Sequence, residues 1–259
     1  MRLRAVAQAP AETIVDVRHV SMVFGEGQNR HAVFEDISFD VVEGEFLCIV
    51  GSSGCGKTTL LRQIAGLQKP TSGTIAFNGA PVTRPTLDKA IVFQDYSKAL
   101  LPWRTVAGNI ALSLEVSGTP KNQIKTEVDD LLLKMGLLPA AAKFPAQLSG
   151  GMQQRVQIAR SLAQRPKIIL MDEPFGALDA ITRQVLQDEL QTLARERNMT
   201  VVFITHDLEE ALYLGDSVIV LASNPGRIVK QIDVELARPR KQLETRENPT
   251  FLRLRHELH

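Results

Sequence analysis

The chain has 259 residues, of which 44% are hydrophobic and 23% charged, and its formal net charge is +1. These values are ordinary for a soluble globular protein with one α/β domain or two small ones, and they allow a sizeable core. A charge so close to zero gives no reason to expect nucleic acid or an acidic partner.

No membrane-crossing or secretory segment is expected. The first ten residues contain two arginines but no apolar run of signal-peptide length, and no stretch of 18 or more apolar residues occurs. The two cysteines, Cys48 and Cys55, are too close together, on a strand and on a loop, for a disulfide to be expected. We predict reduced thiols, as in a cytosolic protein, with Cys48 a small buried hydrophobe and Cys55, near a helix start, mildly reactive.

Strand patterns dominate the first third of the chain. Residues 13–24 and 31–42 partly alternate apolar and polar side chains around a turn, which predicts two antiparallel strands. Residues 46–50 form a short apolar run typical of a buried strand, and residues 59–65 can form a helix. Shorter strands are predicted at residues 74–77, before an Asn-Gly turn, and at residues 90–93.

Helical patterns replace the strands from residue 95 to about 166. The clearest predicts an amphipathic helix, because one apolar face is formed by Ile124, Val128, Leu131, Leu132 and Met135. Strands then return at residues 167–171, 200–204 and 217–221, with helices at 180–198 and 208–214 between them. Continuous apolar strands followed by helices indicate a parallel sheet covered on both faces. The charged segment from residue 237 reads as a solvated tail, in which Phe251 and Leu252 can dock a final helical turn.

Residues 51–58 read GSSGCGKT and fit the phosphate-binding loop pattern G-x-x-x-x-G-K-[ST]. Glycines there allow a tight turn whose N–H groups aim at one anion, and the following helix adds its positive N-terminal dipole. Lys57 is predicted to reach the β- and γ-phosphates of a nucleotide, and the Thr58 hydroxyl to ligate Mg²⁺. An accidental glycine-rich turn is the plain alternative, which the strand, loop and helix setting argues against. The predicted nucleotide contacts are Gly51, Ser52, Ser53, Gly54, Cys55, Gly56, Lys57, Thr58 and Thr59.

An apolar strand ends in Asp172, and Glu173 follows it. In phosphate-loop nucleotidases a strand beside the loop strand places such an aspartate where it can hold Mg²⁺. Glu173 can then point toward the γ-phosphate and orient or deprotonate the attacking water. Without the phosphate loop, a solvated pair at a strand end would be an equal alternative.

Residues 148–155 read LSGGMQQR and open a helix; we call them the signature segment. Ser149 is a good N-cap, and Gly150 and Gly151 leave backbone N–H groups bare, which makes a second anion site without a lysine. A plain capped helix explains a lone Ser-Gly-Gly equally well.

The phosphate loop, the signature segment and the Asp-Glu-Pro strand end, in this order, resemble the ATP-binding-cassette (ABC) ATPases over residues 13–235. The resemblance implies an α/β fold: a phosphate-loop (RecA-like) parallel sheet core with an N-terminal antiparallel β subdomain and an inserted helical subdomain, about residues 95–166. Residues 236–259 would be a charged C-terminal tail.

The resemblance also implies roles for residues that mean little alone. Gln94 matches the glutamine that touches Mg²⁺, beside Thr58 and Asp172, and relays nucleotide state to a membrane partner. Asp179 matches the D-loop, and His206 matches the histidine that contacts the γ-phosphate, although a hydrogen-bonded strand-end histidine would be its plain interpretation. Phe24 occupies the place of the aromatic that stacks on adenine.

The family's mechanism implies a head-to-tail dimer of two copies, in which Ser149, Gly150 and Gly151 of one copy close over ATP held by the other. Residues 92–95, 100–106, 172–183 and 224–228 are similar to the nitrate, sulfonate and taurine importer ATPases. Those bacterial proteins pair with a membrane permease and a periplasmic solute-binding protein, at the cytoplasmic face of the inner membrane. Residues 97–106, with Trp103, would receive the permease, although core packing explains a lone tryptophan as well.

Other functions stay open at this point. A soluble cassette clamp of DNA repair or translation usually carries a long coiled-coil insertion or two cassettes, and this chain has neither. A phosphotransferase or GTPase would leave the signature segment unexplained, and the Asn-Lys-x-Asp motif of GTPases is absent. The solute, which another subunit recognises, could be sulfonate, taurine, nitrate or another small molecule.

Overall fold

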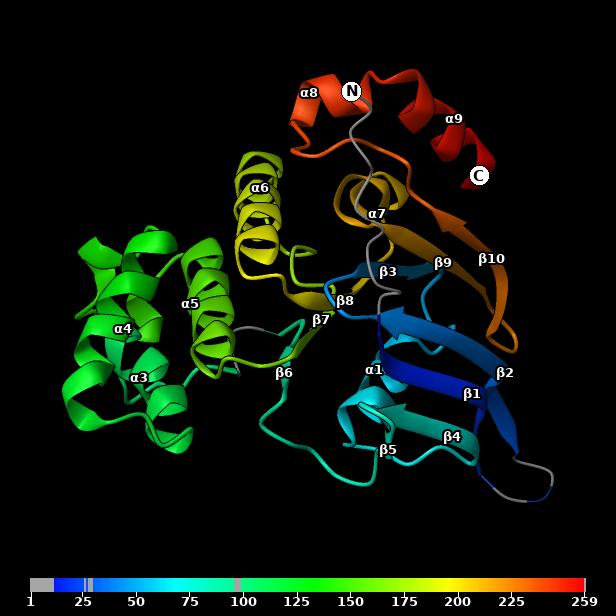
Figure 1. Ribbon diagram of the computed structural model, residues 1–259, viewed down its shortest axis with the longest axis horizontal. Helices are drawn as coiled ribbons and strands as arrows, with labels where there is room; N and C mark the ends of the chain where they lie inside the picture. The colour runs from blue at the N-terminus through cyan, green and yellow to red at the C-terminus, as the bar shows by residue number, and fades with distance from the viewer. Residues whose placement is uncertain (1–11, 26, 28–29, 96–98, 259) are drawn as a thin grey trace, which may run out of the picture.

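Two β-sheets with helices packed around them make up the computed structural model, which describes residues 12–25, 27, 30–95 and 99–258 (Figure 1). The first ten residues, for which no signal peptide is predicted, lie outside this range. Within it, no helix has both the length and the apolar character needed to cross a bilayer.

The larger sheet has six strands in the order β10-β9-β3-β8-β7-β6. All neighbours are parallel except β10, which runs antiparallel to β9. The strands are β3 (Phe46–Gly51), β6 (Lys89–Val92), β7 (Ile168–Asp172), β8 (Thr200–Thr205), β9 (Ser217–Ala222) and β10 (Arg227–Asp233).

The smaller sheet is antiparallel in the order β2-β1-β4-β5, which confirms the hairpin predicted at the start of the chain. Its strands are β1 (Thr13–Phe24), β2 (His31–Val42), β4 (Ser72–Phe77) and β5 (Ala80–Pro81).

The loop strand β3 separates two hydrophobic cores. Cys48 and Val50 face the core that packs against the helices, while Leu47 and Ile49 face the core shared with the smaller sheet and α1 (Lys57–Ala65). Successive side chains of a strand point to opposite faces, so a strand covered on both faces is apolar throughout. This confirms the prediction of a doubly covered parallel sheet.

The described residues between β6 and β7 include three α-helices that pack together at one end of the molecule (Figure 1). They are α3 (Val106–Val116), α4 (Lys121–Lys134) and α5 (Gly150–Ala163), with 3-10 turns at Leu138–Ala140 and Pro145–Gln147. The predicted apolar face is confirmed: Val128, Leu131, Leu132 and Met135 are buried. The remaining helices are α6 (Ala180–Glu196), α7 (Leu208–Leu214), α8 (Gln242–Arg246) and α9 (Pro249–Leu258).

The prediction of a solvated C-terminal tail is wrong, whereas the helical docking expected for Phe251 is confirmed and Leu252 stays exposed. The segment docks as α8 and α9, and Phe251 is fully buried. The buried guanidinium of Arg240 donates to the carbonyls of Leu212, Tyr213 and Gly215, which are the orphan acceptors at the end of α7. A solvated tail is predicted because charged residues dominate the composition of this segment. In the structure, those charged side chains cap the end of α7 or form ion pairs.

Docking of this segment predicts a large effect of Phe251→Ala. Removing a fully buried phenylalanine ring should cost about 3–5 kcal/mol in the free energy of unfolding. Leu252→Ala is the matched control, because that neighbouring side chain is 41% exposed. Equal, small losses for both variants in urea unfolding would show that the segment does not dock.

Candidate functional site

The phosphate loop joins β3 to α1, and its glycines are needed for two different reasons. Gly54 and Gly56 have φ values of 84° and 95°, in the left-handed region that favours glycine. Gly51 is required by space, since a Cβ there would lie 2.6 Å from the carbonyl oxygen of Leu221. Ser52, Ser53 and Gly54 are exposed, so the turn presents its backbone to solvent.

The loop lysine is held inside the turn. Lys57 is only 6% exposed, and its Nζ donates to the carbonyls of Gly51 (2.7 Å) and Ser52 (3.1 Å). The same nitrogen lies 3.9 Å from Oε1 of Glu173. The loop therefore places one cation at the point where its carbonyls and a carboxylate converge.

Four parallel strands bring the other predicted residues to the same edge. β3, β8, β7 and β6 are neighbours in this order, so the segments that follow them start at one edge of the sheet. We expected the strand ending in Asp172 to lie beside the loop strand, but β8 lies between them. The consequence is that His206, directly after β8, sits between the phosphate loop and Glu173.

A hydroxyl and a carboxylate form the candidate Mg²⁺ position. Thr58 Oγ1 donates to Asp172 Oδ1 at 3.0 Å. Burial raises the pKa of Asp172, and the hydrogen bond from Thr58 opposes that rise. Among the described residues no group of three or more His, Cys, Asp or Glu side chains could hold a metal. Two oxygen ligands suit Mg²⁺, which is usually held by one or two protein ligands together with substrate phosphates and water.

Glu173 is the centre of the cluster. Its Oε2 accepts from Gln94 Nε2 at 3.3 Å and lies 3.2 Å from His206 Nδ1. Its φ of 44° is rare for a non-glycine residue, and its N–H is fixed by a bond to the carbonyl of Ile204 (3.0 Å). Backbone strain of this kind concentrates at functional sites. The structure thus brings Lys57, Gln94, Glu173 and His206 together.

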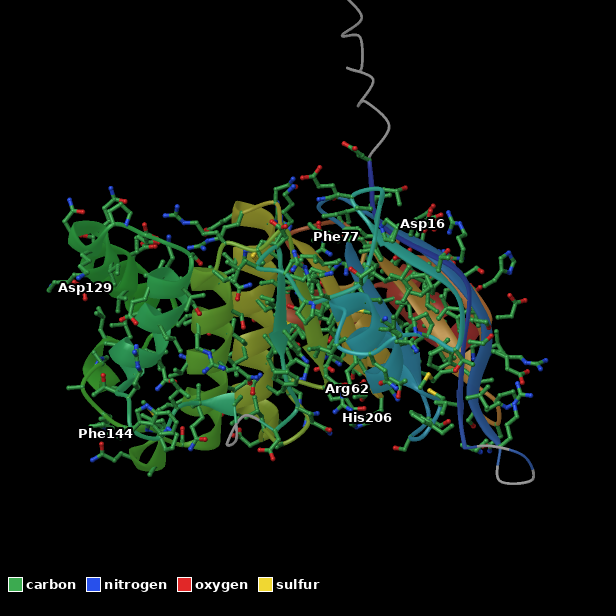
Figure 2. The ribbon with its side chains drawn as sticks, turned by 90° about the horizontal axis from the view of Figure 1, so that it is seen from below. Asp16, Arg62, Phe77, Asp129, Phe144 and His206 are labelled. Atoms are coloured by element: carbon green, nitrogen blue, oxygen red, sulfur yellow. The ribbon has the colours of Figure 1, made fainter. Side chains whose placement is uncertain are left out.

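The signature segment stands apart from this cluster. Ser149 caps α5 as predicted, since its Oγ accepts from the N–H of Met152 at 3.3 Å. A Cβ on Gly151 would lie 2.7 Å from Thr182 in the first turn of α6. Among the described residues, Ser149, Gly150 and Gly151 form no hydrogen bond with the phosphate loop or with Glu173. Figure 2 shows His206 in the sheet part, whereas Phe144, just before the signature segment, lies toward the opposite, helical end.

Two further predicted nucleotide contacts also lie outside the Glu173 cluster. Asp179 caps α6 by accepting from the N–H of Thr182 at 3.0 Å, and hydrogen bonding from the Thr182 side chain, followed by this backbone bond, lowers the pKa of Asp179. Phe24 ends β1 with 47% of its surface exposed. Residues 26, 28 and 29 of the turn that follows it are outside the described range.

The remaining expectations concern the two cysteines and Trp103. Cys55 is fully buried, which contradicts its predicted reactivity, because a reactive thiol needs access to solvent. Cys48 is buried as predicted, neither thiol forms a disulfide, and burial raises the pKa of Cys48. Trp103 is 71% exposed, so core packing does not explain it. Residues 97 and 98 of its segment are outside the described range.

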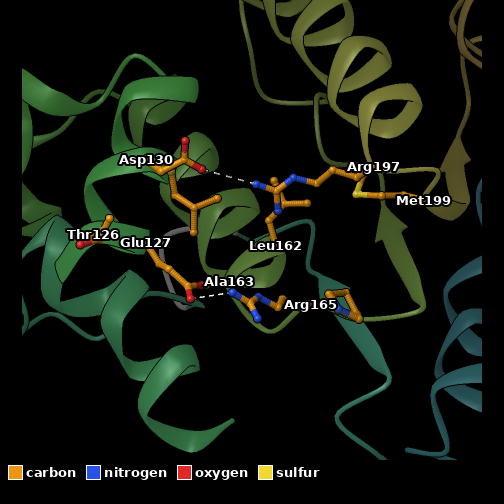
Figure 3. A pocket seen from close by; sticks show the side chains of 10 residues that line it. Thr126, Glu127, Asp130, Leu162, Ala163, Arg165, Arg197 and Met199 are labelled. Atoms are coloured by element: carbon orange, nitrogen blue, oxygen red, sulfur yellow. Dashed lines mark hydrogen bonds and ion pairs between the residues drawn. The ribbon is translucent and has the colours of Figure 1, made fainter. Parts of the chain in front are cut away.

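A hollow of about 660 Å³ lies away from the cluster, between α4 and the loops that follow α5 and α6 (Figure 3). None of the predicted site residues lines it. Two ion pairs cross it, Arg165 to Glu127 at 2.6 Å and Arg197 to Asp130 at 3.8 Å. Charged side chains therefore link the helical part to the rest of the molecule across this hollow, and we call this region the joint.

A profile described as "ABC transporter" matches residues 34–176. Nitrate import ATP-binding protein NrtC of Synechococcus elongatus is 47% identical over 246 residues, which cover 93% of this chain and 37% of NrtC. Bicarbonate transport ATP-binding protein CmpC of the same species is 45% identical, covering 90% of this chain and 35% of CmpC. The uncharacterized ABC transporter ATP-binding protein MJ0412 of Methanocaldococcus jannaschii is 48% identical, covering 86% of this chain and 83% of MJ0412. The chain thus spans little more than a third of NrtC and CmpC and most of MJ0412.

Solved structures with the same fold include two of the cassette MJ0796. One is described as a dimeric bacterial ABC transporter cassette, with a TM-score of 0.76 at 31% identity. The other is described as a dimeric post-hydrolysis state bound to ADP and Pi, with a TM-score of 0.75 at 30% identity. Each alignment covers 86% of this chain and all of MJ0796.

Proposed function

The chain belongs to the ABC transporter family, and from this premise we propose that it hydrolyses ATP to drive the import of a small solute through separate membrane subunits. The proposal of ATP hydrolysis rests on the position of the Glu173 carboxylate. This carboxylate contacts Gln94 and His206 and lies 3.9 Å from the Lys57 ammonium group. This is the arrangement of a base beside a phosphate-binding cation.

The phosphate loop would bind the phosphates of ATP. Its exposed backbone turn and the start of α1 offer N–H donors and a positive dipole end to the phosphates, and Lys57 adds a full charge. Thr58 and Asp172 would hold Mg²⁺, which when bound neutralises charge on the phosphates. Phe24 is proposed to stack on the adenine ring.

Hydrolysis needs one activated water. Glu173 would orient that water and take its proton, as the water oxygen bonds to the γ-phosphorus and the bond to the β-phosphate oxygen breaks. The products are ADP and inorganic phosphate. His206 would contact the γ-phosphate, while Gln94 would hold the Glu173 carboxylate in the orientation needed to accept the proton.

A second copy would complete the site. Ser149 is exposed at the N-terminus of α5, where bare N–H groups favour an anion, yet among the described residues it forms no hydrogen bond with the phosphate loop. The dimeric structures of the related cassette support a dimer, and the proposed arrangement is a head-to-tail pair in which this end, and Asp179, close over the partner's ATP. ATP would then hold the two copies together until hydrolysis releases them.

The names of the relatives support the proposed membrane partner and solute. NrtC and CmpC are named for nitrate and bicarbonate, two small oxyanions, so a small solute with an anionic oxygen group, such as nitrate, a sulfonate or taurine, is the proposed cargo. The exposed Trp103 would lie where a permease binds, at the cytoplasmic face of the inner membrane, and a periplasmic protein would deliver the solute.

The transport proposal is tested by copurification and reconstitution. The chain should copurify with its membrane subunits in mild detergent, and in proteoliposomes its ATP turnover should rise when the loaded solute-binding protein is added. An absence of any membrane protein in the purified complex would contradict the transporter function while leaving ATP hydrolysis intact.

Loss of the metal ligand gives a separate prediction. Thr58→Ala should raise the Mg²⁺ concentration for half-maximal hydrolysis by at least about tenfold, because one oxygen ligand is lost. A Mg²⁺ titration of turnover measures this, with ATP binding in EDTA as the control that should not change. An unchanged Mg²⁺ midpoint would remove Thr58 from the metal site.

A further inference from the structure

A buried glutamine connects the signature helix to the strand that precedes Gln94. Gln157 is fully buried on α5, and its amide lies against the backbone of Phe93. In the amide orientation that satisfies both partners, its oxygen accepts from the Phe93 N–H at 2.7 Å and its nitrogen donates to the Phe93 carbonyl at 3.2 Å. Sequence reasoning missed it, because a single glutamine among apolar helix residues carries no local signal.

Phe93 depends on this contact for its backbone partners. β6 is at the edge of the sheet, and its last ladder pair is Val92 with Met171. Phe93 lies one residue beyond that pair, and its backbone N–H and carbonyl need partners when they are not in the ladder. The Gln157 side chain thus continues the pairing of β6 by one residue and fixes the backbone from which Gln94 emerges.

The two ion pairs across the hollow constrain the joint less than this amide does. They are the pairs drawn in Figure 3, and the Arg165 side chain is 69% exposed. Exposed pairs of this kind contribute about 0–1 kcal/mol and tolerate movement. The two hydrogen bonds between the buried Gln157 amide and Phe93 are short and directional. A shift of α5 is therefore passed to Phe93 more directly through them than through the exposed ion pairs.

We infer that Gln157 is a positioning residue for hydrolysis: it holds Gln94 against Glu173 and couples that contact to the position of the signature helix. The inference rests on the proposed roles of Gln94 and Glu173. The path is short, because α5 begins at the signature segment, Gln157 lies about two turns along it, and Gln94 reaches Glu173 at 3.3 Å. Closing of the signature segment on a partner's ATP would in this way reach the catalytic carboxylate.

The first test is Gln157→Met, which keeps the volume of the side chain and removes both hydrogen bonds. We expect kcat for ATP to fall about 10- to 100-fold with KM changed less than about twofold, because a small misplacement of a catalytic contact costs this much. The amide hydrogen of Phe93 should also exchange faster in hydrogen-exchange mass spectrometry.

The matched control is Gln164→Met, at the C-cap of the same helix. Gln164 donates to the carbonyl of Leu87 at 2.6 Å, before β6 begins and away from Gln94. It should keep the turnover of the unaltered chain. If Gln157→Met does not fold, Gln157→Glu is used instead: it keeps an acceptor for the Phe93 N–H but loses the donor to the Phe93 carbonyl, so it should also lower kcat.

A double-mutant cycle decides between positioning and a merely structural role. If Gln157 acts through Gln94, the pair Gln94→Ala with Gln157→Met should be no slower than Gln94→Ala alone. Multiplying effects, an unchanged kcat in Gln157→Met, or an unaffected Gln94→Ala would each overturn the inference. Failure of the proposed function is a different result, namely retained turnover in Glu173→Gln.

Discussion

Glu173→Gln should reduce ATP turnover by about 10²- to 10⁴-fold, because an amide cannot take the proton of the attacking water. The substitution keeps the size of the side chain, and its amide can still bond to Gln94 or His206. Removing a negative charge 3.9 Å from Lys57 should leave ATP binding intact or strengthen it. ATP-dependent dimerisation should therefore persist, or last longer.

Single-turnover hydrolysis and size-exclusion chromatography with ATP measure the two parts. The control is Glu209→Gln, since Glu209 is outside the cluster and pairs with Arg246 and Arg255 of the C-terminal segment. It should keep normal turnover. Retained hydrolysis in Glu173→Gln would remove Glu173 from the role of base, whatever happened to dimerisation.

Ser149→Asp should abolish ATP-dependent dimerisation and lower turnover by at least about 10²-fold. Aspartate is as good an N-cap as serine, so α5 should stay capped and the chain should stay folded. In a head-to-tail dimer, however, the new carboxylate would face the phosphates held by the other copy, and such like-charge contacts cost several kcal/mol. ATP binding by the monomer should not change.

Ser149→Asn is the matched control, because it also caps the helix and adds no charge. It should lose much less activity than Ser149→Asp. Equal effects of the two variants would mean that bulk or helix capping, and not charge at a shared phosphate site, governs the result. Full activity in Ser149→Asp would contradict the role of the signature segment.

The sequence predicted well what short-range patterns determine. Phosphate-loop glycines, the apolar strands and the face of α4 are local signals, and the structure confirms them. Asp172 and Glu173 could be singled out because a strand end after a phosphate loop restricts their chemistry. The roles of Gln94 and His206 came from the family resemblance, and the structure places both side chains within hydrogen-bond distance of Glu173.

What the sequence could not predict depends on contacts between distant segments. The place of β8 between β3 and β7 is a matter of strand order, which no local pattern encodes. The burial of Arg240 against the end of α7 depends on carbonyls that lie more than 20 residues earlier in the chain. Cys55 is buried because the turn folds it beneath Gly51, and Gln157 finds its partners on a strand far away in sequence.

Mixing two inactive variants tests the central claim, that each ATP site is shared between two copies. Ser149→Asp keeps an intact phosphate loop and Glu173, while Glu173→Gln keeps an intact signature segment. A mixed dimer therefore contains one complete site, formed by the loop of the first variant and the signature segment of the second. We predict that the mixture regains ATP turnover that neither variant has alone. A mixture as inactive as its components, with mixed dimers demonstrated by differently tagged copies, would contradict a shared site.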